Sequence, residues 1–519
     1  MARYYNTSLE EQLIKYGYFS EHIPPCFNTD SFYKQYDILK NAAQKIHSEP
    51  MTLTVAKNDD NFRRTIKIPN PEQQIKLFAF ILDKKNEIDE ILSRNGHTLA
   101  NPIRFTTINY DDIHFFDIPV LKDRHKIKSN FLENLSKKMK RSMGYKYVYK
   151  LDLANFYDSI YTHTIEWAVI GKKEAKENNL RKNHKGNLGE KLDELVGRTN
   201  NKETSGIPTG PFTSRIISEV LLSKVDEEME GIKKSEGIDF DFLHFVDDYE
   251  FYFRSEADYK NTKNQIRHVF DKYRLKINEN KTHFTSYPYH HNTDLRDEFD
   301  YYIDKYKEKT NSQNARMIFF KGDELNNCGE KGAYKYLYKQ LEKINFTEVW
   351  KDIEPFLIGH ILVKPALAQY VIKIIDRHKE FVTEDLKKEL IVNLDISIQD
   401  SLDNEAEWLF WILSVLEVDV SKSDIAKWLI KTEDDLLKIM LINYAHKQGI
   451  EKTTEVQQCL RDILHFLNDE SMRGERWLLI YEWVINKWDG YKELNDKFED
   501  MGFFKALQKR KVIFFNPTG

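Results

Sequence analysis

The chain has 519 residues, of which 41% are hydrophobic, and its formal net charge at pH 7 is −5. This length predicts one to four domains with enough apolar side chains for a sizeable core. No run of about 18 apolar residues predicts a membrane span, and the polar N-terminus lacks a signal-peptide core. The three cysteines, Cys26, Cys328 and Cys459, lie far apart without metal-ligand spacing, which favours a reducing cytoplasmic setting.

The charge is unevenly distributed along the chain. Residues 331–519 contain 27 Lys and Arg against 32 Asp and Glu, so the remaining residues are balanced. A protein that grips a long nucleic-acid duplex usually carries a basic excess, which is absent here. Only local basic runs occur, the strongest being residues 122–150 with ten Lys and Arg against two acids. Such a run is typical both of a solvated helix face and of a phosphate-binding surface.

Residues 62–71 read as a basic strand that ends at a proline. Arg64 and Lys67 are expected to alternate along it and to point together toward an anionic group such as a triphosphate.

A second strand, residues 147–151, runs into Asp152 and is followed by a turn. A carboxylate at a strand end is well placed to bind a cation. Tyr157 follows five positions later. Its ring would clash with the 2′-hydroxyl of a nucleotide sugar, although a tyrosine here is also typical of simple packing.

The next motif is a loop rich in Gly and Pro that opens a helix at residues 216–222. Gly206, Pro208, Thr209 and Gly210 make up this loop, and such a composition lets a backbone approach a nucleotide closely. A Ser or Thr is expected to cap the helix.

Asp247 and Asp248 lie between two apolar runs, a pattern that predicts a β-hairpin with adjacent acids at its turn. An isolated Asp-Asp pair is usually only a turn or a helix cap. Together with Asp152, however, it supplies the three carboxylates that a two-metal phosphoryl-transfer site needs, and oxygen ligands suit Mg²⁺, with Mn²⁺ as an alternative. Lys281 follows later and could protonate pyrophosphate as it leaves.

The C-terminal part reads as successive helices with broad apolar faces, for example around Trp408–Leu416 and Trp477–Trp488. Residues 322–332 contain several Gly and Asn and are expected to form a loop. We therefore predict an α+β fold with two domains, residues 1–330 and an all-helical domain of residues 331–519. Helices of similar length suggest stacked pairs, although no fixed-period sequence repeat is visible.

These motifs, in this order over about residues 50–290, strongly resemble the fingers and palm of reverse transcriptases. The resemblance implies catalytic roles for Asp152, Asp247, Asp248 and Lys281, a metal site that includes Leu153 beside the three aspartates, and a sugar gate at Tyr157. It implies nucleotide contacts from Arg64, Lys67 and the Gly206–Gly210 loop. Two departures occur: Thr209 replaces the usual Gln, and Phe245 replaces the usual Tyr. No recognisable thumb follows Thr282.

A reverse-transcriptase core with this loop and a helical C-terminal half resembles one subgroup, the abortive-infection (Abi) reverse transcriptases of bacterial antiphage defence. This subgroup includes the AbiK, AbiA and P2-prophage types, and size and layout favour the last. The resemblance implies template-independent synthesis of single-stranded DNA from dNTPs, primed by and attached to a tyrosine of the enzyme. It also implies HEAT-like repeats, a trimer or hexamer, and a bacterial cytoplasmic location. Residues 122–150 are then expected to hold the growing strand.

Two other functions remain open from the sequence. One is an RNA-templated reverse transcriptase of a defence system, which would use the same catalytic residues. The other is a helical scaffold with an inactive polymerase domain, against which the intact set of Asp152, Asp247, Asp248 and Lys281 argues.

Overall fold

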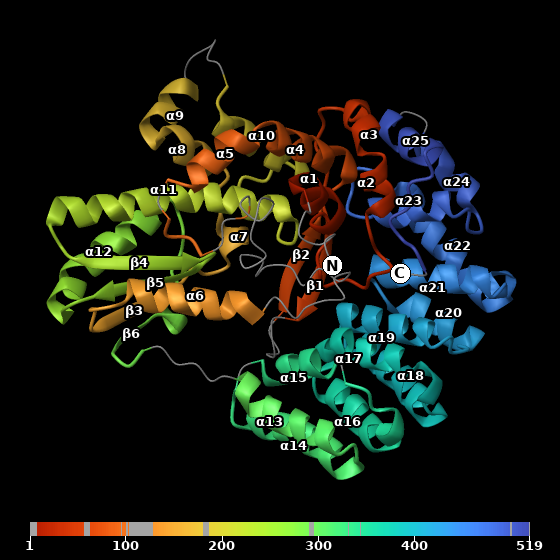
Figure 1. The fold of residues 1–519 in the computed structure, drawn as a ribbon. Helices are drawn as coiled ribbons and strands as arrows, with labels where there is room; N and C mark the ends of the chain where they lie inside the picture. The colour runs from red at the N-terminus through yellow and green to blue at the C-terminus, as the bar shows by residue number, and fades with distance from the viewer. Residues whose placement is uncertain are drawn as a thin grey trace.

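The computed structural model describes residues 8–56, 63–94, 96–99, 102, 128–179, 186–289, 295–330, 332–342, 344–498 and 501–517. A mixed helix–sheet region and a helical region lie side by side, joined by the N-terminal helices (Figure 1). Among the described residues no helix is both long and apolar enough to cross a membrane. The structure therefore has the α+β composition expected.

The N-terminal part forms short helices and a two-stranded sheet. Its elements are α1 (Leu9–Glu11), a π-helix η2 (Gln12–Tyr16), α2 (Asp30–Lys34), α3 (Tyr36–Ala42), β1 (Met51–Ala56), β2 (Arg63–Ile68), α4 (Pro71–Asp83) and α5 (Lys85–Leu92). β1 and β2 pair antiparallel. The Asn70 side chain caps α4 by accepting the Glu72 N–H, and Pro71 occupies the first helical position, where no donor is needed.

The central sheet has four antiparallel strands in the order β4-β5-β3-β6. Its elements are β3 (Tyr147–Asp152), β4 (Phe240–Phe245), β5 (Asp248–Phe253) and β6 (His283–Ser286). The surrounding helices are α6 (Lys128–Arg141), α7 (Phe156–Ser159), α8 (His163–Ile170), α9 (Lys172–Asn179), α10 (Leu188–Thr199), α11 (Phe212–Glu236), α12 (Glu256–Lys272) and the 3₁₀ turn η6 (Glu279–Lys281).

The two faces of this sheet differ in chemistry because side chains alternate along each strand. Leu151, Tyr249 and Phe251 face the main core, where the Tyr249 ring meets Phe270 of α12 edge-on at 5.1 Å. The opposite face carries Asp152, Asp248, Glu250 and a small cluster of Val148, Tyr252 and Tyr289. Lys138 of α6 binds Glu250 on that face at 2.8 Å. The carboxylates thus lie on the thinly covered side of the sheet.

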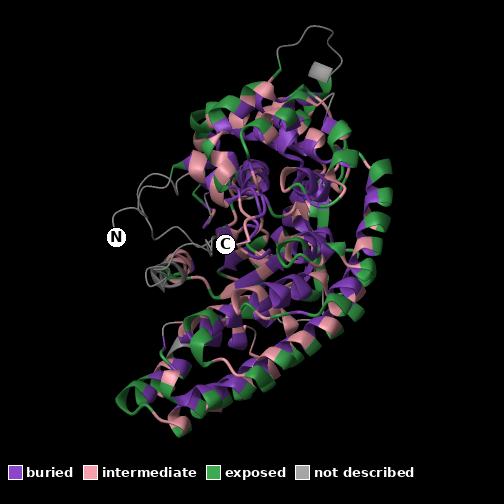
Figure 2. Cartoon of the chain, turned by 90° about the vertical axis from the view of Figure 1, so that its right-hand side faces the viewer, coloured by how far each residue is buried: buried purple, intermediate pink, exposed green. Residues whose placement is uncertain are grey.

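The helical region follows β6 directly. It comprises α13 (Leu295–Glu308), α14 (Ser312–Asn327), α15 (Ala333–Leu341), η7 (Thr347–Val349), α16 (Trp350–Val363), η8 (Pro365–Leu367), α17 (Ala368–Arg377), η9 (Lys379–Phe381), α18 (Glu384–Gln399), α19 (Asp403–Val415), α20 (Lys422–Lys431), α21 (Asp435–Lys447), η10 (Ile450–Lys452), α22 (Thr454–Asp469), α23 (Trp477–Ile485), α24 (Tyr491–Asn495), η11 (Asp496–Phe498) and α25 (Gly502–Lys509). Figure 2 shows these helices as an arc with their buried residues turned inward.

The prediction of a loop at residues 322–332 is wrong for residues 322–327, because α14 continues through Gly322 to Asn327. A Cβ on Gly322 would lie only 2.6 Å from Leu337 of α15, so this glycine permits close packing of two helices. α13 and α14 therefore pack into the helical stack although they precede residue 331. The domain boundary at 330 stays a prediction.

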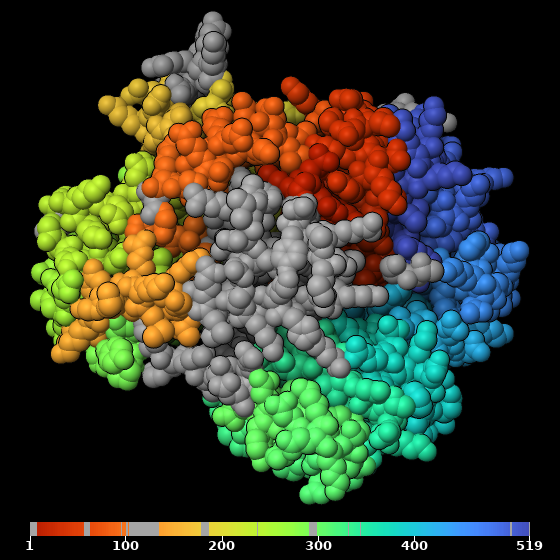
Figure 3. Space-filling model, viewed as in Figure 1, coloured from red at the N-terminus to blue at the C-terminus, as the bar shows by residue number. Residues whose placement is uncertain are grey.

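The C-terminal segment returns to the N-terminal region. Phe515 forms a β-bridge with Phe27, and the Asn28 N–H donates to the Phe514 carbonyl at 2.9 Å. In the space-filling view, N-terminal helices (red) adjoin the last helices (blue) (Figure 3). Glu482 of α23, which has no exposed surface, accepts the N–H groups of Phe514 and Phe515 at 2.8 and 3.3 Å. These contacts tie the two ends of the described chain together.

Replacing Glu482 by glutamine tests this anchor through its pH dependence. Burial raises the pKa of Glu482 to about 7, while hydrogen bonds from Phe514 and Asn486 oppose the shift. The folded state therefore binds the extra proton, and its stability falls as pH rises from about 4.5 through 7, by on the order of 2–3 kcal/mol. The glutamine side chain cannot titrate. We expect the difference in thermal unfolding midpoint, variant minus wild type, to grow in favour of the variant from pH 5 to pH 8. A difference that does not change with pH would contradict this account.

Candidate active site

Asp152 and Asp248 are direct partners across the β3–β5 ladder, so both side chains leave the same face of the sheet. Phe245 at the end of β4 pairs with Asp248 at the start of β5. The turn between these strands therefore has two residues, and Asp247 is the second of them. Asp152 and Asp247, 95 positions apart in the sequence, are thus joined by the ladder register and by a hydrogen bond from the Leu153 N–H to the Asp247 carbonyl at 3.1 Å. The fold brings the three predicted aspartates together.

The turn that carries Asp247 has an unusual backbone. Val246 adopts a φ of 55°, in the left-handed region that β-branched residues rarely enter. Two-residue hairpin turns require such angles and normally use Gly or Asn there. A valine in this conformation costs on the order of 1–3 kcal/mol, and strain of this kind concentrates at functional sites.

Asp152 is held from two sides. Lys281 Nζ lies 2.9 Å from one carboxylate oxygen, and the Asn278 amide donates to the other at 3.1 Å. Lys281 is half exposed, and its pKa is raised, chiefly by the hydrogen bond to Asp152. Leu153 has a buried side chain. An alkyl side chain also offers no ligand atom, so only the backbone carbonyl of Leu153 could serve as the metal ligand expected at this position.

The site is strongly negative. The pKa of Asp248 is raised to about 6, first because protein displaces water around the carboxyl and then because Asp247 and Asp152 repel its charge, while Lys281 and Lys138 oppose the shift. Carboxylates directly opposite one another destabilise a sheet unless a cation lies between them. This all-oxygen set, on a rigid strand pair, fits hard divalent ions such as Mg²⁺.

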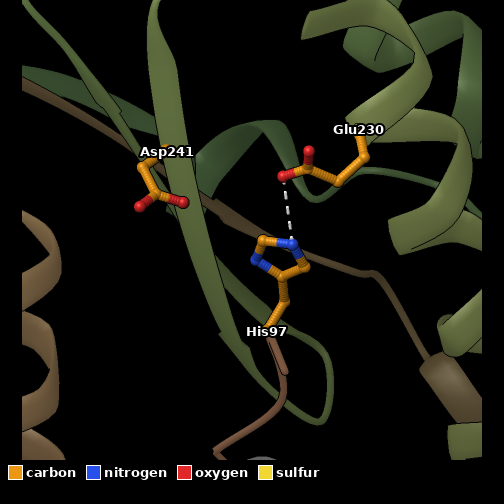
Figure 4. A group of neighbouring side chains, drawn as sticks. All are labelled: His97, Glu230 and Asp241. Atoms are coloured by element: carbon orange, nitrogen blue, oxygen red, sulfur yellow. Dashed lines mark ion pairs between the residues drawn. The ribbon is translucent and has the colours of Figure 1, made fainter. Parts of the chain in front are cut away.

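A separate group of possible metal ligands lies at the edge of the sheet. The ligand atoms of His97, Glu230 and Asp241 all lie within 4.8 Å of one another, a spacing that no other group of three such side chains reaches in the described part of the chain. Figure 4 shows the Glu230 carboxylate aimed at the His97 ring, with Nε2 and Oε1 3.1 Å apart. Arg141 already binds both oxygens of Asp241 at 3.0 Å. We therefore interpret this group as an ion-pair network. The carboxylate oxygens of Asp152, Asp247 and Asp248 do not form such a group, so they are spaced more widely than these ligand atoms. A wider spacing suits two ions about 3.5–4 Å apart.

Arg64 and Lys67 of β2 do not share a partner, contrary to expectation. Side chains three positions apart point to opposite faces of a strand. Arg64 contacts the His22 ring and lies within electrostatic range of Asp247 and Tyr157. Lys67 instead donates to Asn200 Oδ1 at 3.0 Å. Of these two residues, Arg64 is the one near Asp247, and a nucleotide contact by Lys67 stays a prediction.

Arg215, in the first turn of α11, is a site residue that the sequence analysis missed. It is largely buried, and burial lowers its pKa to about 10, against the opposing charges of Tyr157, Glu219 and Asp247. The sequence feature that indicates Arg215 is its position shortly after the Gly206–Gly210 loop. Tyr157 lies in the same group, half-buried, with its pKa raised mainly by burial.

The Gly206–Gly210 loop packs between β2 and the turn after Asp152. Gly206 has a φ of +85°, and a Cβ there would lie 3.0 Å from the Asp158 carbonyl. The Ile207 N–H donates to the Tyr157 carbonyl at 2.9 Å, and the Thr209 carbonyl accepts the Lys67 N–H at 2.8 Å. Burial raises the pKa of Asp158, and the nearby charge of Lys67 opposes this shift. The loop therefore fixes Tyr157 relative to β2.

Replacing Gly206 by alanine should disturb this junction. We expect a loss of about 1–3 kcal/mol of stability from the positive φ and the close carbonyl. Gly231→Ala is the matched control, since Gly231 lies within α11 with open space around its Cα. That change should stabilise the chain by about 0.5–1 kcal/mol. Thermal unfolding of both variants measures the contrast, and equal midpoints would contradict it.

A cavity of about 300 Å³ adjoins Arg64 and extends to the helical region. Basic and aromatic residues line part of it, namely Arg63, Arg64, Lys335, Lys364 and Tyr370. Tyr370 of α17 is also within electrostatic range of Arg64. The helical region therefore borders the aspartate site through Arg64.

Comparison with known families gives a match over part of the chain. Residues 98–347 match the reverse transcriptase (RNA-dependent DNA polymerase) family. The chain therefore contains a reverse-transcriptase domain, and such a domain indicates a nucleotidyltransferase that uses divalent metal ions. The match spans β3 to β6, including Asp152, Asp247, Asp248 and Lys281, and ends within the helical region.

Other comparisons add less. No curated protein sequence matches the chain. Similar solved structures include telomerase from Candida albicans with a TWJ fragment of telomeric RNA, at 12% identity and a TM-score of 0.30 over 74% of this chain and 68% of that one. Apo telomerase from Candida tropicalis gives 13% identity and a TM-score of 0.31 over 82% and 75%. Likenesses this low support no conclusion.

Proposed function

We propose that this chain joins deoxynucleoside triphosphates into DNA at Asp152, Asp247 and Asp248. The observation that carries the proposal is the register that places Asp152 opposite Asp248, beside the turn that carries Asp247. Bound Mg²⁺ or Mn²⁺ would supply charge stabilisation at the reacting phosphate and a more acidic attacking hydroxyl. Asp152, Asp247, Asp248 and the Leu153 carbonyl would hold these ions.

The remaining residues have assigned roles in this proposal. Arg64 and Arg215 bring positive charge to the side of Asp247, where a triphosphate needs it. Tyr157 supports the sugar. A hydroxyl oxygen attacks the α-phosphorus and releases its proton to water, the bond from that phosphorus to the pyrophosphate oxygen breaks, and Lys281 donates a proton to the leaving group. Its raised pKa means that Lys281 carries this proton beforehand.

We further propose that synthesis is template-independent and protein-primed, and that the protein acts in antiphage defence as an abortive-infection reverse transcriptase of the P2-prophage type. Thr209 supports this, because it replaces the Gln that usually lies near the templating position of reverse transcriptases. In the described part of the chain, the next elements after β6 are the packed helices α13 to α15, where a duplex-holding thumb is usual, and this order also supports the proposal. HEAT-like repeats, a homo-oligomer and a bacterial cytoplasmic location belong to the same proposal.

Nucleic-acid-free synthesis tests this proposal. Purified, nuclease-treated protein is incubated with Mg²⁺ and labelled dNTPs, and the products are separated on a denaturing gel. We expect label that migrates with the protein and shifts after protease digestion. Mass spectrometry then identifies the linked residue among the 28 tyrosines. Tyr370 is the first candidate, because it and Asp247 both lie near Arg64. Label that is never protein-bound would contradict protein priming.

An RNA-templated reverse transcriptase is the second candidate, favoured by the family that residues 98–347 match. It predicts products whose sequence copies an added RNA and whose yield falls after nuclease treatment. A helical scaffold with an inactive polymerase domain predicts instead that Asp247→Asn leaves the biological activity intact.

A further inference from the structure

A buried charge network lies directly beneath the turn that carries Asp247. His244 at the end of β4, Asp226 of α11 and Tyr249 of β5 are each no more than 3% exposed. His244 Nε2 lies 3.0 Å from Asp226 Oδ2, and the Tyr249 hydroxyl donates to Asp226 Oδ1 at 3.2 Å. The rings of His244 and Tyr249 stack at 4.7 Å. The aspartate site does not use these groups directly.

The hydrogen bonds define the protonation of His244. Its Nδ1 lies 3.2 Å from the Val246 carbonyl oxygen, which can only accept. Its Nε2 faces the Asp226 carboxylate, which also only accepts when ionised. Both ring nitrogens must therefore carry protons, so the ring is an imidazolium. The surrounding charges also favour the imidazolium. Burial alone would lower the pKa of His244, but the negative charges of Asp226 and Glu219 raise it to about 9.

The bond to the Val246 carbonyl acts on the strained part of the turn. Val246 has a φ of 55°, and its carbonyl belongs to the same rigid peptide plane as the Asp247 nitrogen. The Asp247 carbonyl is fixed in turn by the Leu153 N–H at 3.1 Å. Asp247 is thus held on both sides, by His244 before it and by β3 after it.

The edge of β4 supports the same residue. The His244 N–H donates to the His97 carbonyl at 3.1 Å, and the Leu99 N–H donates to the His244 carbonyl at 2.8 Å. His244 therefore cannot move away from the turn without breaking its backbone pairing. Its side chain acts from a fixed support.

We propose that His244, anchored by Asp226, is a positioning residue that keeps the Val246–Asp247 turn in its strained conformation and so aims the Asp247 carboxylate at the metal site. This role rests on the proposed function of the aspartates. It differs from simple core packing because the hydrogen bond fixes the orientation of the Val246–Asp247 peptide plane. Removing the steric strain at Val246 should therefore compensate for the loss of that hydrogen bond.

The double variant His244→Phe, Asp226→Asn tests the proposal. The introduced phenylalanine keeps a ring against Tyr249, and the introduced asparagine avoids an unpaired buried charge. We expect the affinity for Mn²⁺, measured by electron paramagnetic resonance without nucleotide, to fall about tenfold. The kcat of dNTP incorporation should fall about 30-fold, with a KM for dNTP within about twofold of the wild-type value.

Adding Val246→Gly to this double variant separates positioning from structure. Glycine adopts a positive φ without steric strain, so Mn²⁺ affinity and kcat should recover at least fivefold. A double variant with unchanged Mn²⁺ affinity, or one whose loss glycine does not reverse, would overturn the proposal. Wild-type protein that binds Mn²⁺ but never incorporates dNTP would contradict the proposed function alone, and the Mn²⁺ affinities would still decide the role of His244.

Discussion

Asp247→Asn should reduce dNTP incorporation by about a thousandfold or more while the protein remains folded. The amide is nearly isosteric with the carboxylate, and the backbone bond from Leu153 to the Asp247 carbonyl does not involve the side chain. The change removes one of three negative groups that share the site. Incorporation of a labelled dNTP in the presence of Mg²⁺ measures the effect.

Asp304→Asn provides the control for this substitution. Asp304 lies on α13, is largely exposed, and pairs locally with Lys307. This variant should incorporate dNTP at the wild-type rate. An Asp247→Asn variant with more than a tenth of wild-type activity would show that Asp247 does not act in the reaction. The thermal unfolding midpoint of Asp247→Asn should equal or exceed that of the wild type, since loss of the Asp247 charge relieves repulsion with Asp248.

Tyr157→Ala should weaken the exclusion of ribonucleotides by about 100-fold, judged by the ratio of kcat/KM for dNTP to that for rNTP. The ring is half-buried between the aspartate turn and Arg215, held through the Ile207 N–H bond to its carbonyl. Without the ring, a 2′-hydroxyl no longer meets a steric barrier. Steady-state incorporation of matched dNTP and rNTP pairs measures this ratio.

Tyr157→Phe separates the ring from its hydroxyl. The ring stays in place, so discrimination should remain close to that of wild type. If Tyr157 only packs the turn, Tyr157→Ala will lower the thermal midpoint and slow both substrates equally. An unchanged ratio would therefore exclude the role as a sugar gate.

The aspartates could be located from the sequence because each is defined by local pattern. Asp152 ends an apolar strand. Asp247 and Asp248 lie between two strand-like runs that are close enough in sequence to form a β-hairpin. The register that pairs Asp152 with Asp248 follows from alternation, since a slip by one residue would turn Leu151 and Tyr249 out of the core.

The supporting residues could not be located in this way. His244 and Asp226 are 18 positions apart on a strand and a helix, and only tertiary packing brings them together. Arg215 follows the loop motif, but nothing local indicates that it faces Asp247. Gly322 was assigned to a loop, because the sequence does not show Leu337 packed against it. The strand period by itself predicts that Arg64 and Lys67 point to opposite faces, as the structure shows.

Of the basic run at residues 122–150, the structure describes α6 and the residues after it, while 122–127 lie outside the described residues. Lys138 and Arg141 of α6 pair with Glu250 and Asp241 on the face that carries the aspartates. A role for this run in holding a single strand stays a prediction. Charge reversal at the exposed Lys140 should then shorten the products.

Anomalous diffraction from crystals grown with Mn²⁺ and a non-hydrolysable dNTP analogue tests the central claim most directly. We expect Mn²⁺ bound by the carboxylate oxygens of Asp152 and Asp247, with Asp248 beside them and Lys281 displaced from Asp152. Mn²⁺ found only at His97, Glu230 and Asp241, with the three aspartates unliganded, would contradict it.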